Sequence, residues 1–320
     1  RQIFIEPGAP SSRPVLVLTT ADASGVPLTH LLPREHYTQI RWFIDYALPD
    51  QDLDLPPHDL VFNGIGDPDF MPTLTPAVRR LLGRADPPVL NDPAQVSRTH
   101  RSELPDLLSG IPDIVVPPVS RVTDANAIHD VLCRPGLGLP VIIRPLGSHG
   151  GAGLRKVDSA EELASLARLH GGAYVTKFVD YRSEDGFYRK YRMIFVNRQP
   201  YPYHLAIGPV WLVHYWTSGM ADDAVRREEE RRFLADPETA IGARAMTALS
   251  RIGAKLDLDY AGIDFSVLPD GRLLVFEANA TMLVHPEHEA KFAYKNQAVE
   301  RILNAFHAML VRYSRAKGEA

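Results

Sequence analysis

The chain has 320 residues, a length that suggests two or three packed units instead of one typical domain. Hydrophobic residues make up 45% and charged residues 23%, which excludes an intrinsically disordered chain. The uninterrupted apolar runs are only a few residues long, which excludes a membrane-spanning helix of roughly 20 apolar residues. The formal net charge is −4 and no stripe of Lys and Arg stands out, which argues against nucleic acid as a partner.

A single cysteine, Cys133, rules out disulfides within the chain and fits a reducing compartment. Its simplest interpretation is a buried thiol and not a nucleophile. Residues 1–25 lack the basic start and the long apolar core of a signal peptide, although the sequence begins at Arg1 and not at Met. We therefore expect a cytoplasmic protein whose native chain extends upstream of Arg1.

The first 115 residues alternate between strand-like and helix-like segments, a pattern that predicts a parallel sheet. The expected strands are residues 15–18, 59–64 and 88–91, and the expected helices are residues 75–83 and a second one that begins at Pro93. Residues 36–48 fit either a helix or an interrupted strand. Ligands of parallel sheets lie beyond the carboxyl ends of the strands, so Thr19, Thr20 and Asn63 are candidate substrate-facing residues.

A second unit is expected after a connector that spans residues 117–138 and contains a helix near 124–132. Ser159 and Glu162 form a capping box at the start of a helix that follows the strand 140–144. Further expected strands are residues 174–179, 188–196, 200–207 and 210–215, and then the hairpin strands 262–268 and 272–277. Further expected helices are residues 241–256 and 294–313, whereas residues 221–234 fit a solvated helix face or a mobile loop.

Arg144 ends a strand and precedes a loop with four glycines between residues 147 and 153. Glycines let backbone N–H groups approach phosphate oxygens, and the cation supplies positive charge for the same phosphates. A plain glycine-rich turn explains the pattern equally well. No Gly-Lys-Ser/Thr follows, so the loop is not a Walker A motif.

Three oxygen-bearing side chains meet on the expected hairpin. Asp264 lies on one strand, and Glu277 and Asn279 lie two residues apart on the other, so an extended chain directs both to one face. Such oxygen ligands suit Mg²⁺, which lets phosphates complete its coordination. Because a carboxylate in the apolar run 273–278 would be costly to bury without a function, the pattern favours a metal site.

Cations lie on the strands between these two motifs, namely Lys177, Arg189, Lys190 and Arg192. Arg192 alternates with apolar neighbours in the manner of a strand residue that faces a cleft. Surface charge explains these cations equally well, so the residues alone leave their role open.

Four segments, in this order, resemble the ATP-grasp superfamily of ligases, in particular the branch of glutathione synthetases and ribosomal-protein glutamate ligases. They are PVIIRPLGSHGGAG (140–153), YVTKFVDY (174–181), YRKYRMIFVN (188–197) and AGIDFSVLPDGRLLVFEANAT (261–281). The resemblance covers essentially the whole chain and implies the α/β (α+β) ATP-grasp fold. It implies a pre-ATP-grasp domain with a parallel sheet over residues 1–115, a central subdomain with a glycine-rich flap over 116–180, and a C-terminal subdomain with a metal-binding hairpin over 181–320.

The same resemblance implies a role for each matching residue. ATP is expected to contact Arg101, Arg144, Gly147, Ser148, His149, Gly150, Gly151, Gly153, Lys177, Phe178 and Val179. Mg²⁺ is expected on Asp264, Glu277 and Asn279, with Arg192 and Arg144 as catalytic cations.

The chain departs from the family pattern at several positions. Arg144 and Arg101 stand where the family normally has lysines, and both keep the charge while adding bidentate geometry. The acidic residue expected near the ribose has two candidates, Glu184 and Asp185. Substrate contacts are expected from His204 and His214, which fill a segment that the branch uses for phosphate- and substrate-facing residues.

These roles imply an ATP-dependent ligase that joins a carboxylate to an amine through an acyl phosphate and releases ADP and phosphate. A phosphotransferase on the same fold is the alternative among enzymes. A catalytically idle nucleotide-binding scaffold is the alternative outside them. The expected partners are small-molecule carboxylate and amine substrates, with a homo-oligomer left open, and the sequence does not identify either substrate.

Overall fold

Alternating strands and helices at the start of the chain build a five-stranded sheet, as the sequence pattern predicted. The computed structural model describes all residues except 1, 22–27, 67, 69–75, 85–86, 124–126, 147, 149–150, 152, 166–171, 281 and 316–320. The strands of the first sheet are β1 (Ile3–Glu6), β2 (Arg13–Thr19), β3 (Tyr37–Phe43), β4 (Leu60–Asn63) and β5 (Val89–Leu90), in the spatial order β1-β3-β2-β4-β5. All neighbouring pairs are parallel except β1 with β3.

The open alternative for residues 36–48 is resolved as a strand followed by a short 3₁₀ turn. Strand β2, which pairs with β3, is buried through four consecutive apolar residues, as expected of a parallel strand covered on both faces. The helical pieces of this unit are η1 (Ile44–Tyr46), η2 (Gln51–Leu53), α1 (Pro76–Leu82), α2 (Pro93–Ser97) and α3 (Leu104–Leu107).

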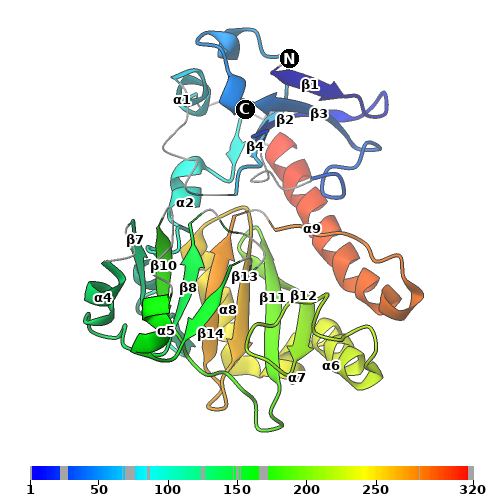
Figure 1. Cartoon of the computed structure of the whole chain (residues 1–320). Helices are drawn as coiled ribbons and strands as arrows, with labels where there is room; N and C mark the ends of the chain where they lie inside the picture. Colours follow the sequence, from blue (N-terminus) through cyan, green and yellow to red (C-terminus); the bar gives the residue numbers. More distant parts are fainter. Residues whose placement is uncertain are drawn as a thin grey trace.

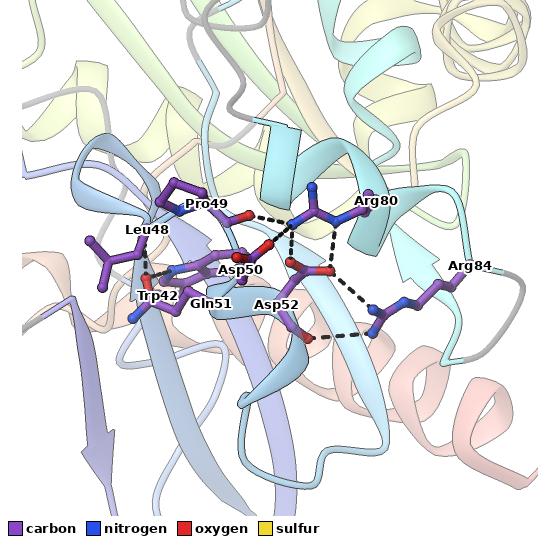
Figure 2. A network of polar contacts seen from close by, with 8 residues as sticks. All are labelled: Trp42, Leu48, Pro49, Asp50, Gln51, Asp52, Arg80 and Arg84. Carbon is purple, nitrogen blue, oxygen red and sulfur yellow. Dashed lines mark hydrogen bonds and ion pairs between the residues drawn. The ribbon is translucent and has the colours of Figure 1, made fainter.

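A buried carboxylate fixes α1 to the segment that precedes β4 (Figure 2). Asp52 is only 2% exposed and accepts hydrogen bonds from Arg80 at 2.6 and 3.3 Å and from Arg84 at 3.0 Å. Beside it, the Trp42 indole N–H donates to the Gln51 side chain at 3.1 Å. These bonds satisfy polar groups at the edge of the core and so hold the turn around Asp52 in one arrangement.

The middle of the chain forms a second, antiparallel sheet in the order β7-β10-β8-β9. Its elements are β7 (Val119–Val122), α4 (Ala127–Leu132), β8 (Val141–Pro145), β9 (Arg155–Val157), α5 (Ala160–Ser165) and β10 (Ala173–Lys177). The Ser159 half of the predicted capping box is present, because the Glu162 N–H donates to Ser159 Oγ at 3.2 Å; the Glu162 carboxylate accepts from the N–H of the preceding residue, Asp158, at 2.7 Å. Cys133 is exposed, so its expected burial was wrong.

The third sheet has the order β12-β11-β13-β14-β6 and is antiparallel except where β14 pairs with β6. Its strands are β6 (Ile114–Val115), β11 (Tyr188–Val196), β12 (Gln199–Gly208), β13 (Tyr260–Val267) and β14 (Leu273–Asn279). The expected hairpin is therefore present. Strand β6 joins this sheet although it lies just before residue 116, where we predicted the central unit to begin.

Residues 210–215 are not the strand that their apolar alternation predicted, but part of an irregular loop over residues 209–217. Pro209 follows β12 directly and cannot donate to a ladder, and β12 is already the edge of its sheet. The open alternative for residues 221–234 is resolved as a helix, capped by Asp223, whose side chain accepts from the Val225 and Arg226 N–H groups.

Helices pack on both faces of the third sheet, because Met193 and Phe195 of β11 share a core with residues 245–256, whereas Ile194 and Val196 share another with residues 299–310. They are α6 (Ala224–Ala235), α7 (Pro237–Ile241), α8 (Ala243–Leu256), the 3₁₀ turn η4 (Ala290–Lys295) and α9 (Asn296–Arg315). Gly253 of α8 lies so close to the sheet that a Cβ there would meet the Arg198 carbonyl oxygen at 2.3 Å. In the part of the chain that the structure describes, no helix has the length and apolar character needed to cross a membrane.

The first sheet is joined to the third by a buried asparagine and by α9. Asn91 has a left-handed backbone (φ 54°) and bonds through its side chain to the backbone of Tyr260 and Ala280. Phe306 of α9 packs edge-on against Phe62 of β4, with ring centroids 5.5 Å apart. These contacts place the first and third sheets in one continuous packing arrangement, beside which the second sheet lies (Figure 1).

Candidate active site

A cavity of about 790 Å³ lies between the second and third sheets. Strands β8 and β10 supply one wall, and β11, β13 and β14 supply the other. The irregular loop 209–217 closes one side, with Trp211, His214 and Trp216 in the cavity lining. The cavity is large enough for a ligand of nucleotide size, since ligand sites typically measure about 300–1,000 Å³.

Four lining residues lie side by side across four adjacent strands, and we call them the polar row (His204, Arg192, Asp264 and Glu277). Arg192 is opposite His204 in the β11–β12 register and opposite Asp264 in the β11–β13 register, and Asp264 is opposite Glu277. Because side chains alternate along a strand, the neighbours Met193, Ile263 and Phe265 face the core below. Asn279 lies two residues beyond Glu277 and lines the same cavity.

Both carboxylates of the polar row are held by cations. Asp264 accepts two parallel hydrogen bonds from Arg192, at 2.7 and 2.9 Å, and Lys190 Nζ lies 3.4 Å from the same carboxylate. Glu277 accepts a hydrogen bond from Arg101 at 2.7 Å. Such bidentate and charge-assisted bonds are the strong ones among protein hydrogen bonds.

The cations decide the ionisation of these acids. Burial acts to raise the pKa of Asp264, but Arg192 and Lys190 outweigh burial and hold that pKa well below its ordinary value. Burial likewise opposes ionisation of Glu277, and Arg101, with a smaller effect of Arg144, holds its pKa below the ordinary value. Both carboxylates are therefore charged at neutral pH and able to bind a cation.

Arg144 reaches the cavity from the opposite wall, at the end of β8. Burial, with the neighbouring charge of Arg101, lowers its pKa to about 10, because burial penalises the charged form. Among the described lining residues, five cations (Arg101, Arg144, Lys177, Lys190 and Arg192) stand against the two carboxylates of the polar row. The lining therefore carries an excess of three positive charges, which favours an anionic ligand.

The other end of the cavity is apolar and aromatic. Phe178 and Trp211 meet edge to face with centroids 5.8 Å apart, and Tyr181 lies 5.0 Å from Phe276. Tyr181 donates its hydroxyl proton to the Trp211 carbonyl, which ties loop 209–217 to the strand end after β10. This end suits a flat apolar ring.

The predicted adenine-contacting segment, residues 177–179, lies at this apolar end. The Lys177 ammonium is directed to the connector and donates to the carbonyls of Gly138 and Leu139 at 2.7 and 3.0 Å. The backbone N–H groups of Lys177 and Phe178 donate to Pro118 and Pro140. These two donors are thus used within the protein.

The predicted flap is described only in part, because Gly147, His149 and Gly150 lie outside the described residues. Ser148 donates to the Pro145 carbonyl at 2.8 Å, and Gly151 lines the cavity. Gly153 has φ +71° and a Cβ there would meet the Pro145 ring at 2.9 Å, so both the backbone and the space require glycine.

Several predicted site residues lie elsewhere. Asp185 is bound by Arg189, which lowers its pKa to about 2, and neither Asp185 nor its neighbour Glu184 lines the cavity. No acidic residue near a ribose is therefore identified at this position.

The three candidates on the first sheet are also remote from the cavity lining. Asn63 is fully buried and donates to the Asn91 carbonyl at 3.0 Å, while its oxygen accepts from the Ile65 N–H at 3.2 Å. Thr19 and Thr20 end β2 on the same sheet, and neither lines the cavity. Asn63 thus has a structural use that explains its presence without a substrate.

His204 and His214, in contrast, both line the cavity. Sequence reasoning missed Tyr181, Tyr215 and Trp216, which line it too, and left Lys190 undecided. The signal that could have found Tyr215 and Trp216 is the concentration of ring side chains at Trp211, His214, Tyr215 and Trp216 shortly after Pro209, where a ladder strand is disfavoured.

The residues that the family resemblance assigned to magnesium fit that ion. Two carboxylates and an amide supply hard oxygen donors, and Mg²⁺ commonly takes only one or two carboxylates while phosphates and waters complete its shell. Within the described ranges, no group of three His, Cys, Asp or Glu side chains could hold a metal ion. A metal at the polar row would therefore depend on ligand phosphates as well as on the protein.

Comparison with known proteins gives matches of structure alone. No protein-family model and no curated protein matches the chain. The structure is similar to PsnB, an ATP-grasp ligase solved with its minimal precursor, with a TM-score of 0.53 and 14% identity over 93% of this chain and 99% of that chain.

Two further solved structures agree. A RimK-domain ATP-grasp protein from Sphaerobacter thermophilus has a TM-score of 0.52 and 14% identity, over 94% of this chain and 99% of that one. The D-alanine–D-alanine ligase from Bacillus anthracis has a TM-score of 0.52 and 11% identity, over 96% and 99%. The chain therefore has the ATP-grasp fold that its motifs predicted.

Proposed function

We propose that the protein is an ATP-dependent ligase that joins a carboxylate to an amine and releases ADP and phosphate. The observation that carries the proposal is the polar row, in which two ionised carboxylates lie among cations on the wall of a nucleotide-sized cavity. The solved structures with this fold include PsnB and D-alanine–D-alanine ligase, both named as ligases. The reducing cytoplasm suits the exposed thiol of Cys133.

The cavity offers a different environment to each part of ATP. Adenine would occupy the aromatic end, between the walls that contain Phe178 and Phe276. The triphosphate would lie towards Arg101 and Arg144, where positive charge is in excess. Asp264, Glu277 and Asn279 would hold Mg²⁺, which would neutralise part of the phosphate charge when bound.

The protein's own groups then account for the transfer. An oxygen of the substrate carboxylate forms a bond to the γ-phosphorus, the bond between that phosphorus and the β-phosphate oxygen breaks, and ADP leaves. The amine nitrogen next forms a bond to the carbonyl carbon, the bond from that carbon to the phosphate oxygen breaks, and a proton passes to solvent. Arg192 and Arg144, which both line the cavity, would stabilise the negative charge that develops at these oxygens.

The ion pairs at the polar row also explain how the site is held ready without ligand. Arg192 keeps Asp264 ionised and oriented, and Arg101 does the same for Glu277. Arg101 and Lys190 have long side chains. When the nucleotide binds, they can leave their carboxylate partners and contact phosphate oxygens instead. The negative charge of the phosphates then balances the net positive charge of the cavity lining.

Carboxylate-dependent release of ADP tests the proposal. Purified protein is incubated with Mg²⁺–ATP, pools of amino acids and small carboxylates, and hydroxylamine as a general acceptor, and ADP and hydroxamate are measured. We expect ADP release that requires a carboxylate and yields a hydroxamate. A phosphorylated product without hydroxamate would support a phosphotransferase, and nucleotide binding without turnover in any pool would support an idle scaffold.

A further inference from the structure

Two histidines in the cavity wall each have a ring nitrogen without a partner in the part of the chain that the structure describes. Nε2 of His204 and Nδ1 of His214 are buried and make no hydrogen bond. The whole His204 residue is only 7% exposed. Because buried polar atoms are nearly always hydrogen-bonded, unpartnered nitrogens in the wall of a cavity point to a ligand group that satisfies them.

The position of these rings separates them from the proposed metal ligands. His204 is at one end of the polar row, next to Arg192, and Glu277 is at the other end. His214 comes from loop 209–217, which closes the same cavity. His204 therefore lies beyond Arg192 as seen from the proposed metal ligands, and His214 lines the same cavity.

The surrounding aromatic residues fix the direction of the His204 ring. Its ring centroid lies 5.3 Å from that of Tyr203 and 5.1 Å from that of Tyr215. Tyr215 donates at 2.8 Å to Glu230, a fully buried carboxyl group that also accepts from the Leu205 N–H at 3.1 Å. A ring held in this way presents its nitrogen in one direction, as a binding site requires.

The charge of the surroundings decides what the imidazoles can bind. Burial, followed by Arg192, lowers the pKa of His204 well below its ordinary value, and burial, followed by Lys190, lowers that of His214. Asp264 opposes both shifts but does not reverse them. Both rings are therefore neutral near pH 7. A neutral imidazole carries one N–H and one lone pair, so in one tautomer each unpartnered nitrogen presents its lone pair to an N–H or O–H donor, while the nearby cations disfavour an ammonium ion.

We propose that His204 and His214 form the subsite for the attacking nucleophile and hold it in its neutral form by accepting hydrogen bonds from its N–H or O–H group. The inference rests on the proposed function and adds the chemical class of the acceptor, a neutral amine or hydroxyl compound. During transfer, the nucleophilic atom bonds to the carbonyl carbon, the bond from that carbon to the phosphate oxygen breaks, and phosphate leaves with the electron pair. The proton of the nucleophile passes to solvent.

Hydroxylamine is the probe, because it carries both N–H and O–H nucleophiles. The substitutions are His204→Phe and His214→Phe, which keep a ring of similar size, and the carboxylate is the one that stimulates ADP release in the wild type. The matched control is His58→Phe, because His58 Nε2 is also buried without a partner among the described residues but lies outside the cavity lining. Thermal unfolding confirms that each variant folds.

We expect each cavity variant to raise the KM for hydroxylamine about 10-fold, the effect of losing roughly one hydrogen bond, while the KM for ATP stays within about two-fold. His58→Phe leaves both values unchanged. The hydroxamate and O-acyl products distinguish an amine site from a hydroxyl site. An unchanged KM for hydroxylamine in both variants, or an equal rise in the KM for ATP, overturns the subsite.

If the proposed function is wrong, the wild type shows no carboxylate-dependent ADP release. That result overturns the proposed function and the subsite together. His214 lies on a partly exposed loop, so His214→Phe tests the subsite even where His204→Phe does not fold. His214→Gln retains a hydrogen-bond acceptor, so we expect it to recover most of the affinity for hydroxylamine. A Gln variant no better than the Phe variant would overturn the hydrogen-bonding role.

Discussion

One buried side chain, Asn91, makes the polar part of the contact between the first and third sheets, and its removal should be costly. Asn91 is fully buried; its amide group donates to the Tyr260 carbonyl at 2.7 Å and to the Ala280 carbonyl at 2.9 Å, and its oxygen accepts from the Tyr260 N–H at 2.8 Å. The substitution Asn91→Ala removes all three bonds and leaves their backbone partners buried and unsatisfied.

The magnitude follows from those bonds. A buried hydrogen bond whose partner stays unsatisfied costs about 1 kcal/mol or more, so three of them amount to about 3 kcal/mol. Asn91 also has φ 54°, a left-handed conformation that costs alanine about 1 kcal/mol more. We therefore expect the free energy of unfolding to fall by about 4 kcal/mol, a large part of the 5–15 kcal/mol typical of folded proteins.

Urea unfolding followed by tryptophan fluorescence measures this change, since Trp42 is in the first sheet and Trp211 is in the cavity wall. The matched control is Asn304→Ala, on an exposed position of α9, which we expect to change the free energy of unfolding by less than about 0.5 kcal/mol. A loss below about 1 kcal/mol for Asn91→Ala would refute the idea that this residue joins the two sheets.

Three further predictions concern single carboxyl groups. Glu277→Gln should keep its fold yet slow carboxylate-dependent ADP release roughly 10²-fold or more, because a proposed metal ligand loses its charge. The control is Glu300→Gln, at an exposed position of α9. Near-normal turnover in a folded Glu277→Gln variant would contradict the metal role. Burial raises the pKa of Glu230 above its ordinary value of 4.5, so the folded state holds this proton more tightly, and its contribution to stability falls as pH rises from about 4.5 through the raised pKa. In urea titrations at several pH values Glu230→Gln should lack that decline, and parallel curves for both proteins would exclude it. The hydrogen bonds from Arg80 lower the pKa of Asp52, so the stability that Asp52 supplies is present above its ordinary value of 3.8 and is lost as pH falls through the lowered pKa. Asp52→Asn should therefore lower the urea midpoint at pH 7 and approach the wild type in acid, whereas a gap independent of pH would rule out this linkage.

The local pattern of the sequence was enough to predict the hairpin and the acidic side chains that it carries. Asp264 and Glu277 interrupt apolar runs on adjacent strands, and burial of an acid without a partner is so costly that a functional site was the better interpretation. The structure places both in the cavity. Their partners could not be predicted in the same way, because Arg101 and Glu277 are 176 residues apart and meet only when the chain has folded.

The register between neighbouring strands was a second feature that the sequence did not predict. The ladder shifts between Arg192 and Met193 and again between Asp264 and Phe265, and such bulges leave no clear mark in a strand of apolar residues. The alignment of the polar row depends on these shifts. The apolar alternation of residues 210–215 likewise predicted a strand. Pro209 lacks the N–H that a strand ladder needs, and the chain forms a loop after the edge strand β12 instead.

The residues that the general rule for parallel sheets selected do not line the cavity. Thr19 and Asn63 do end parallel strands of the first sheet, as expected. The cavity, however, lies between the two antiparallel sheets, where the charged residues of β11, β13 and β14 face those of β8. The charge pattern was thus a better guide to the site than the topology of the first unit.

Transfer of oxygen from the substrate carboxylate to phosphate tests the proposed ligase most directly. The carboxylate that stimulates ADP release is labelled with ¹⁸O on both oxygens, and the phosphate released in the presence of an acceptor is examined by mass spectrometry. An acyl phosphate requires that one carboxylate oxygen leave with the phosphate, so we predict one ¹⁸O atom in each phosphate molecule. Phosphate without the label would contradict this account.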